Sequence, residues 1–247
     1  MRFIEDIAYG LHPSQKLDVY LPDAETFPVY VHIHGGGFEN GSKADCRTIA
    51  EYLTEYGIAV VAPEYRMYPD AAYPDYLRDS ASAVAWAYKK MGEYGANGRL
   101  FVGGTSAGGY ASMMLCFDKR WLAPHKLPKD AITGYFHDAG QPTVHFNIMR
   151  ERGLDSRRIM VDEAAPLYHI GEDPEYPPMH FLVSDNDIPC RYEQIMTTMA
   201  TMKYLGYDMD KVTWQLMHGT HCWYYRRKDE NGVSLMGPLI RDFIEKH

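Results

Sequence analysis

A serine set between glycines is the feature of this sequence with the clearest chemical meaning. Residues 103–109 are Gly-Gly-Thr-Ser-Ala-Gly-Gly, after an apolar run that ends at Val102 and before a stretch typical of a helix. A serine in such a strand-to-helix turn is strained and exposed, and small residues such as Gly104 and Gly108 are needed where the backbone folds back on itself. The five residues alone also fit an ordinary glycine-rich loop. With a strand before them and a helix after them, they indicate that Ser106 is a nucleophile.

A second glycine cluster precedes this one. Residues 34–38, His-Gly-Gly-Gly-Phe, close the apolar run 29–33. Consecutive glycines let backbone N–H groups turn toward a ligand, which is what stabilising the oxyanion of a tetrahedral intermediate requires. By itself the cluster fits a flexible surface turn. Together with Ser106 it predicts an oxyanion hole made by the N–H groups of Gly36, Gly37 and Ala107.

Two aspartates are candidates for the carboxylate that would orient a catalytic histidine. Residues 177–183 predict a buried parallel strand after a Pro-Pro stop, and Asp185 and Asp187 follow it. A carboxylate just past such a strand lies at the edge where open α/β sheets form their sites. Counting from the strand favours Asp187 as the residue that turns back toward a histidine. Asp185 then caps or braces the turn.

Two histidines compete in the same way for the role of the base. Residues 212–216 predict the last strand, and His218 and His221 follow it. Gly219 gives the loop freedom to bring His221 over the sheet edge, whereas His218 still belongs to the strand end. The resulting chain order of serine, aspartate and histidine is that of α/β-hydrolases and differs from the orders in chymotrypsin and subtilisin.

These motifs make the chain resemble an α/β-hydrolase of the hormone-sensitive-lipase-like branch, near the small bacterial carboxylesterases that include acetyl and feruloyl esterases. The resemblance covers nearly the whole chain and includes residues 17–22, 60–66, 73–79 and 165–167. It implies that Tyr65, Arg66 and Asp79 are structural braces. Two departures keep the choice between Asp185 and Asp187 open: Ser184 stands where the family has glycine, and the segment after Asp187 is about one residue short.

The order of elements predicts the fold. Apolar runs alternate with helical stretches at residues 46–56, 76–91, 110–117, 192–205 and 238–246. Such alternation favours a mostly parallel central sheet with helices on both faces. The family implies antiparallel edge strands in the residues up to Pro22. We therefore expect a single α/β-hydrolase domain over residues 1–247.

One region interrupts the alternation. After a predicted strand at 132–136, the residues from about 137 to 165 form an arginine-rich insertion, which we expect to be a small cap over the nucleophile. Its arginines are Arg150, Arg152, Arg157 and Arg158. They could meet a substrate carboxylate or sugar, but a solvated helical face paired with Glu151, Asp155, Asp162 and Glu163 is favoured. His137, Asp138 and His145 do not have the spacing of a common zinc site, so we expect no metal and no cofactor.

Together these features predict a serine carboxylesterase that cleaves short-chain or aryl esters through an acyl-enzyme. The family resemblance extends this to acetyl or feruloyl groups on sugars or phenols. An amidase, formamidase or peptidase would use the same three side chains. A non-catalytic binding protein of this fold is disfavoured because such proteins typically lose part of the triad.

Charge and hydropathy limit the classes of partner that this chain could bind. The net charge is −8, from 25 basic and 33 acidic residues, so binding to nucleic acid or anionic lipid has no electrostatic support. No apolar run approaches the length of a membrane span, and the N-terminus lacks a signal-peptide pattern, so we expect a cytoplasmic enzyme. Four cysteines show no metal or disulfide spacing, and Cys222 is expected to pack as a small hydrophobe. The oligomeric state stays open, a homo-oligomer included.

Overall fold

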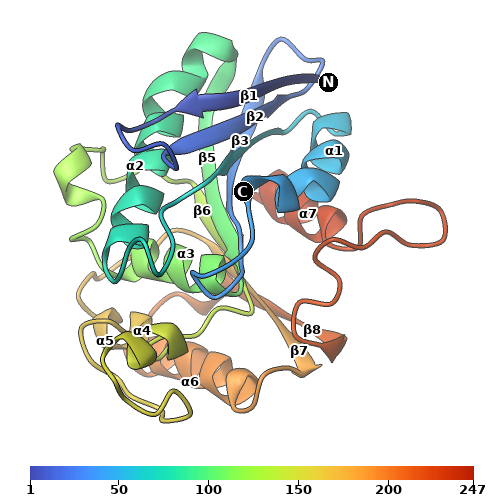
Figure 1. The fold of residues 1–247 in the computed structure, drawn as a ribbon. Coiled ribbons are helices and arrows are strands. Elements are labelled where there is room, and N and C mark those ends of the chain that lie inside the picture. Colours follow the sequence, from blue (N-terminus) through green and yellow to red (C-terminus); the bar gives the residue numbers. More distant parts are fainter.

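A computed structural model describes all of residues 1–247. One eight-stranded sheet runs through it in the order β1-β2-β4-β3-β5-β6-β7-β8 (Figure 1). The strands are β1 (Arg2–Ala8), β2 (Lys16–Leu21), β3 (Phe27–Ile33), β4 (Ala59–Pro63), β5 (Ala96–Thr105), β6 (Gly134–Asp138), β7 (Met179–Asn186) and β8 (Val212–Thr220). Strands β3 to β8 are parallel, and β1 and β2 are antiparallel at one edge. Both features of the predicted sheet are confirmed.

Helices cover both faces of this sheet, as predicted (Figure 1). The helices are α1 (Arg47–Glu55), α2 (Asp75–Lys90), α3 (Ala107–Phe117), α4 (Phe146–Glu151), α5 (Pro166–His169), α6 (Arg191–Tyr204) and α7 (Gly237–Lys246). Successive strand residues point to opposite faces. Accordingly Val29 and Val31 join the core beneath α2, α3 and α6, whereas Tyr30 joins the core beneath α1 and α7. None of the helices combines the length and apolarity needed to cross a bilayer.

The parallel strands bring distant segments of the chain to one edge. Parallel strands have their carboxyl ends at the same edge of a sheet. The glycine segment 34–38 follows β3, Ser106 follows β5, and Asp187 follows β7. His221 follows β8 directly. The topology alone therefore gathers the predicted site residues at this edge.

The insertion begins two residues later than predicted. Strand β6 extends to Asp138, so His137 and Asp138 are fully buried strand residues and not part of a loop. The sequence misplaces this boundary because polar side chains normally mark the end of a buried strand. Here the interior supplies a partner for each side chain, since His137 Nδ1 lies 2.9 Å from Ser112 Oγ and Asp138 accepts from Thr105 at 2.8 Å. His137 Nε2 is buried without a partner. The insertion then contributes the short helix α4 before α5 begins.

The family-implied brace forms as expected. Arg66 donates two side-chain hydrogen bonds of 2.8 Å to the carboxylate of Asp79, one to each oxygen. The hydroxyl of Tyr65 donates to the carbonyl of His34 at 2.9 Å. These contacts tie the segment after β4 to helix α2 and to the end of β3. The brace therefore holds the base of the glycine segment 34–38.

Candidate active site

Ser106 lies on a strained turn between β5 and α3. Its φ of 57° and ψ of −111° fall in a region that non-glycine residues rarely occupy. Its backbone N–H donates to the carbonyl of Asp138 at 2.8 Å, which anchors the turn to β6. A Cβ atom on Gly104 would lie 2.5 Å from the backbone of Gly108, and one on Gly108 would lie 1.9 Å from the carbonyl oxygen of Ile33. The predicted need for these two glycines is confirmed.

Ser106, His221 and Asp187 are hydrogen bonded in series. His221 Nε2 lies 2.8 Å from Ser106 Oγ, and His221 Nδ1 lies 2.5 Å from Asp187 Oδ1. Because the carboxylate can only accept, Nδ1 carries the proton and Nε2 is left free to accept from the serine hydroxyl. Asp187 is itself held by the backbone N–H groups of Ile188 at 2.7 Å and Ser184 at 3.2 Å. This arrangement can remove the serine proton during attack on a carbonyl carbon.

The competing pair, Asp185 and His218, forms a separate contact. His218 Nδ1 lies 2.7 Å from Asp185 Oδ2, and the N–H of Gly219 donates to Asp185 Oδ1 at 2.9 Å. The hydrogen bond from His218 lowers the pKa of Asp185. Asp185 therefore braces the turn that carries His221. The sequence predicts this bracing role for Asp185 when Asp187 is the carboxylate that faces the histidine.

The predicted oxyanion donors have free N–H groups. Gly36 and Gly37 have φ values of 111° and 69°, and no protein acceptor takes the N–H of either. Ala107 is the first residue of α3, where backbone N–H groups lack a partner within the helix. The carbonyl of Gly36 accepts from Glu39 and Asn40 at 3.1 and 2.9 Å. Because a peptide unit is planar and trans, these bonds fix the direction of the Gly37 N–H.

His34 orients the other peptide unit of this segment. Its Nδ1 lies 2.7 Å from the carbonyl of Gly35, which sets the direction of the Gly36 N–H. Its Nε2 lies 2.7 Å from Glu64 Oε1, and its ring stacks on Tyr65 with centroids 4.2 Å apart. The role of Glu64 was not anticipated from the sequence. The only sequence signal is its position beside the Tyr65–Arg66 brace.

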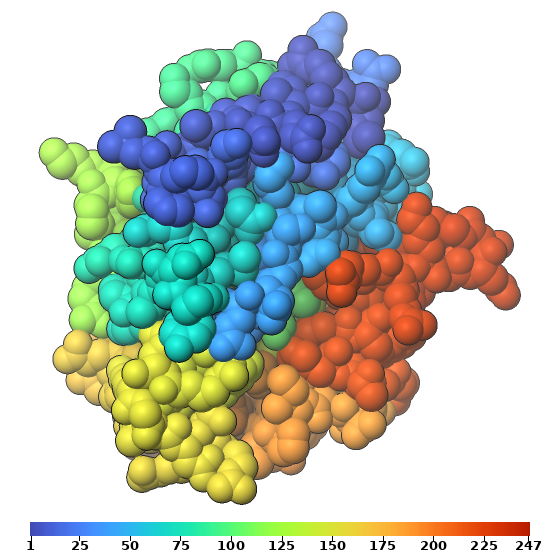
Figure 2. All heavy atoms as spheres, in the orientation of Figure 1, coloured from blue at the N-terminus to red at the C-terminus, as the bar shows by residue number.

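The insertion contacts this glycine segment directly. Asn147 Nδ2 donates to the carbonyl of Gly37 at 2.9 Å, and the ring of Phe146 packs over Gly37. In Figure 2 the yellow insertion lies against the blue segment that follows β3. No motif marks Asn147, because a lone asparagine has no distinguishing spacing.

The arginines of the insertion do not form one helical face, because α4 ends at Glu151. Two of the expected pairings occur, Arg152 with Asp162 and Arg157 with Asp155, each at 2.6 Å. Arg150 instead pairs at 3.0 Å with Glu39, outside the insertion. Glu151 pairs with none of these arginines and accepts the backbone N–H of Tyr73 at 2.8 Å.

The remaining candidates near the site have other partners. Cys222 Sγ lies 3.4 Å from His221 Nε2, so this thiol contacts the imidazole in addition to packing as a small hydrophobe. Burial raises the pKa of the Cys222 thiol. His145 accepts the backbone N–H of Asn147 at 3.2 Å and caps α4. His137, Asp138 and His145 thus belong to three different hydrogen-bond networks.

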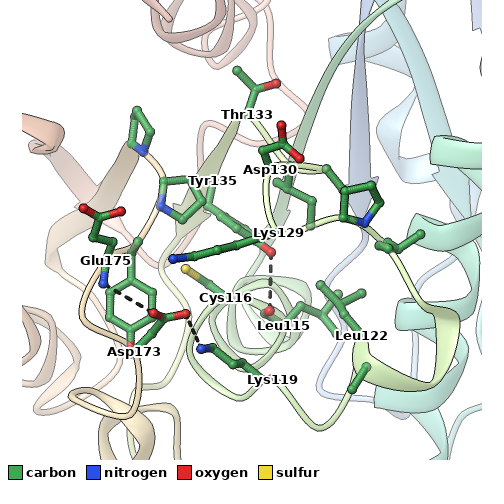
Figure 3. Close-up of a pocket in the computed structure, with 18 residues that line it drawn as sticks. Leu115, Cys116, Lys119, Leu122, Lys129, Asp130, Thr133, Tyr135, Asp173 and Glu175 are labelled. Carbon is green, nitrogen blue, oxygen red and sulfur yellow. Dashed lines mark hydrogen bonds and ion pairs between the residues drawn. The ribbon is translucent and has the colours of Figure 1, made fainter.

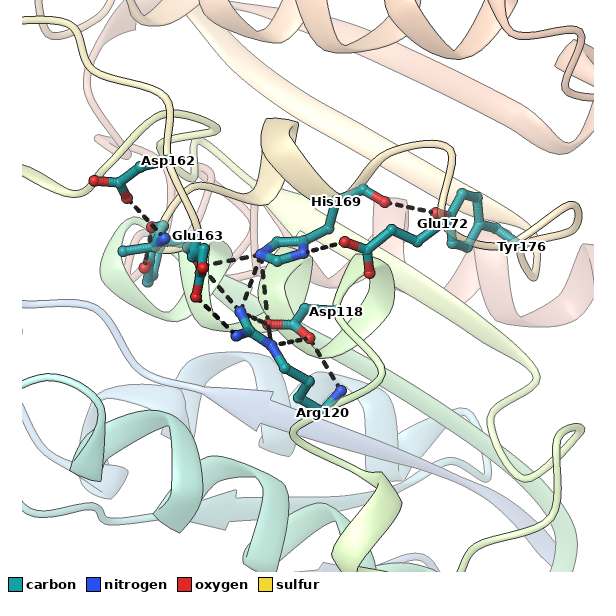
Figure 4. Close-up of polar contacts among 9 residues, drawn as sticks. Asp118, Arg120, Asp162, Glu163, His169, Glu172 and Tyr176 are labelled. Carbon is teal, nitrogen blue, oxygen red and sulfur yellow. Dashed lines mark hydrogen bonds and ion pairs between the residues drawn. The ribbon is translucent and has the colours of Figure 1, made fainter.

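Two further features lie away from Ser106, toward the opposite end of α3. A cavity of about 770 Å³ opens beside Leu115, Cys116 and Tyr135 (Figure 3). With a rise of about 1.5 Å per helical residue, it lies roughly 14 Å along α3 from Ser106. At the same end, Arg120 lies 2.9 Å from the buried Asp118 and 3.4 Å from His169 (Figure 4). This network ties α3 to α5.

Comparison with known proteins agrees with this architecture. In sequence, the chain is 33% identical over 107 residues to the probable isoprenylcysteine alpha-carbonyl methylesterase ICMEL1 of Arabidopsis thaliana, covering 42% of this chain and 22% of that protein. It is 34% identical over 116 residues to the probable carboxylic ester hydrolase LipM of Mycobacterium tuberculosis, covering 44% and 27%. The matched segments span about a quarter of these curated relatives.

In structure, the chain is similar to esterase B from Lactobacillus rhamnosus (HN001), with a TM-score of 0.78 and 17% identity over 99% of this chain and 86% of that one. This likeness shows the α/β-hydrolase fold. The BD-FAE family model matches residues 17–148, which include the glycine segment, the brace and the nucleophile turn. The chain therefore belongs to the BD-FAE family of α/β-hydrolases.

Proposed function

We propose that this protein is a serine carboxylesterase that cleaves short-chain or aryl esters through an acyl-enzyme. The observation that carries the proposal is the 2.8 Å contact between Ser106 Oγ and His221 Nε2, with Asp187 behind the imidazole. The names of both curated relatives describe ester hydrolysis, which favours an ester over an amide.

The reaction follows from these groups. His221 takes the proton of Ser106 as Ser106 Oγ bonds to the ester carbonyl carbon, and Asp187 stabilises the imidazolium that forms. The N–H groups of Gly36, Gly37 and Ala107 bind the oxygen that becomes negative. His221 then protonates the leaving alcohol, and it later activates a water molecule that releases the acid.

Site geometry is also the basis for the substrate class. Ser106 and Gly37 are partly exposed and Gly36 is exposed, so an ester group reaches them from solvent. Phe146 packs against Gly37 beside this opening and offers an apolar contact. These features favour a small acyl group or an aromatic ring, and resemblance to the family extends the alcohol part to acylated sugars and phenolic esters.

Substitution of the nucleophile tests the proposal. We expect Ser106→Ala to lower kcat for p-nitrophenyl acetate by at least about 10⁴-fold, because the remaining groups cannot form the acyl-enzyme. Ser82→Ala is the matched control, since Ser82 is half-buried on α2 and donates only to the carbonyl of Arg78. Substantial activity in Ser106→Ala would contradict the assignment.

The acyl length and bond type need their own measurement. Among acetyl, butyryl and octanoyl esters, we expect kcat/KM to fall sharply beyond butyryl. The feruloyl ester should still be cleaved efficiently. Matched anilides of the same acids should be cleaved far more slowly. Faster cleavage of the anilides would make the protein an amidase that uses the same three side chains.

A further inference from the structure

Asp138 is a buried carboxylate directly behind the nucleophile, and the proposed reaction does not use it. It is the last residue of β6 and is fully buried. Its carbonyl accepts the N–H of Ser106 at 2.8 Å. It therefore contacts the nucleophile turn through its backbone while its side chain lies in the interior.

The side chain of Asp138 joins two segments of the site. Oδ2 accepts from the hydroxyl of Thr105 at 2.8 Å, and Thr105 immediately precedes Ser106. Oδ1 accepts from the hydroxyl of Tyr224 at 2.5 Å, and Tyr224 is three residues after His221. Tyr224 is itself fully buried. One carboxylate thus links the nucleophile turn to the loop that carries the base.

The electrostatic surroundings of this carboxylate are unusual. Its two donors are neutral hydroxyls, and the charged groups that act on it are His221 and Asp187. Burial, opposed by the hydrogen bonds from Tyr224 and Thr105, raises the pKa of Asp138 to about 6. The other titratable groups that face it are Tyr30 of β3 and Cys222 and Tyr225 of the histidine loop.

We propose that Asp138 is a positioning residue of this reaction, which holds the Ser106 turn and the His221 loop in register and supplies a second negative charge that acts on the imidazole. The inference rests on the proposed function. When His221 becomes an imidazolium, Asp187 is hydrogen bonded to it, and Asp138 acts through space and through Tyr224. A neutral group of the same shape keeps the packing but loses this charge.

The isosteric variant Asp138→Asn separates these contributions. We expect its kcat for p-nitrophenyl acetate at pH 8 to be about tenfold below wild type, with KM little changed, since one lost charge interaction of ordinary size has that effect. As the pH falls through 6, wild-type Asp138 becomes protonated and resembles the variant. The ratio of wild-type to variant kcat should therefore shrink to about two or less at pH 5.

A purely structural role would not change this ratio with pH. Asp118→Asn is the matched control: Asp118 is equally buried, but it binds Arg120 at the far end of α3. We expect it to lower the melting temperature and to leave the pH dependence of kcat as in wild type. A constant wild-type to Asp138→Asn ratio from pH 5 to 8, or equal kcat values at pH 8, would overturn the inference.

Tyr224→Phe gives a second test that does not depend on Asp138→Asn folding. Losing the hydroxyl donor raises the pKa of Asp138 further, because that hydrogen bond lowers it. The acidic step in kcat should move to higher pH, and an unmoved step would contradict the inference.

If Ser106→Ala loses activity while the pH profiles of these variants stay unchanged, the proposed function stands and the proposed role of Asp138 is wrong. If Ser106→Ala keeps activity, the proposed function itself fails.

Discussion

At the scale of single residues, two Asp–His pairs lie at the carboxyl ends of the last two strands, and burial distinguishes them. The side chains of Asp187 and His221 are 2% and 22% exposed, whereas those of Asp185 and His218 are 42% and 86% exposed. A hydrogen bond between charged or polar groups is stronger away from water. The inner pair can therefore orient an imidazole toward Ser106, while the outer pair is largely screened by solvent.

The two aspartates should differ strongly on substitution. We expect Asp187→Asn to lower kcat by about 10⁴-fold, because an amide favours the wrong tautomer of His221. Asp185→Asn is the matched control and should change kcat by no more than severalfold. Steady-state rates with p-nitrophenyl acetate measure both, and a reversed order would assign the acid to Asp185.

The sequence narrowed this choice but could not complete it. Both aspartates follow the strand predicted at residues 177–183, and Ser184 occupies the position where the family has glycine. Which carboxylate turns inward depends on the path of the loop, and that path is set by contacts across the sheet edge. One such contact is the 3.0 Å hydrogen bond from Ser184 Oγ to the carbonyl of Thr220, the residue before the proposed base.

At the scale of elements, the insertion supports the glycine segment. Its helix α4 places Asn147 against the carbonyl of Gly37 and the ring of Phe146 over the same residue. Backbone donors stabilise an oxyanion only when they are held in place before the reaction. The insertion therefore supports the glycine segment that we propose as the oxyanion hole.

Removing this support should slow catalysis more than binding. We expect Asn147→Ala to lower kcat about tenfold with a small change in KM, because a loosened Gly37 binds the transition state less well. Arg157→Ala, in the exposed part of the insertion, is the control and should leave both constants unchanged. An Asn147→Ala enzyme that folds and keeps wild-type kcat would show that Gly37 is held by its own turn.

Element positions were predicted better than element ends. The five helical stretches predicted from residue patterns correspond to α1, α2, α3, α6 and α7. The boundary error at β6 arose because His137 and Asp138 are polar residues at the buried carboxyl end of a strand. Only their buried partners, Ser112, Thr105 and Tyr224, make that placement favourable.

At the scale of the whole molecule, the ion pair between the half-buried Arg66 and the buried Asp79 connects the site edge to the body of the fold. Asp79 is almost fully buried and also accepts from Gln15 Nε2 at 2.7 Å, next to the edge strand β2. Removing the Asp79 charge weakens its hydrogen bonds to Arg66 and Gln15 inside the fold and leaves Arg66 with Asp75 alone, at 3.6 Å. We therefore expect this contact to contribute to global stability and not to the chemistry.

Substitution of Asp79 should show this division. We expect Asp79→Asn to lower the free energy of unfolding by about 3 kcal/mol, while the folded variant keeps kcat within about twofold of wild type. Urea denaturation measures the first quantity and initial rates the second. Asp155→Asn removes an exposed pair with Arg157 and should change stability very little. A large loss of kcat in folded Asp79→Asn would give the brace a direct role in the site.

The sequence by itself determined the sheet class, the order of its elements and the edge at which the site residues gather. These follow from the spacing of apolar residues along the chain and from the positions of the glycines. They also follow from the rule that parallel strands have their carboxyl ends at the same edge of a sheet. The tertiary structure alone decided which carboxylate faces His221, that Asn147 holds the glycine segment and that Asp138 joins Thr105 to Tyr224. Those contacts join segments far apart in the chain, and their formation depends on loop paths and burial that no local residue pattern encodes.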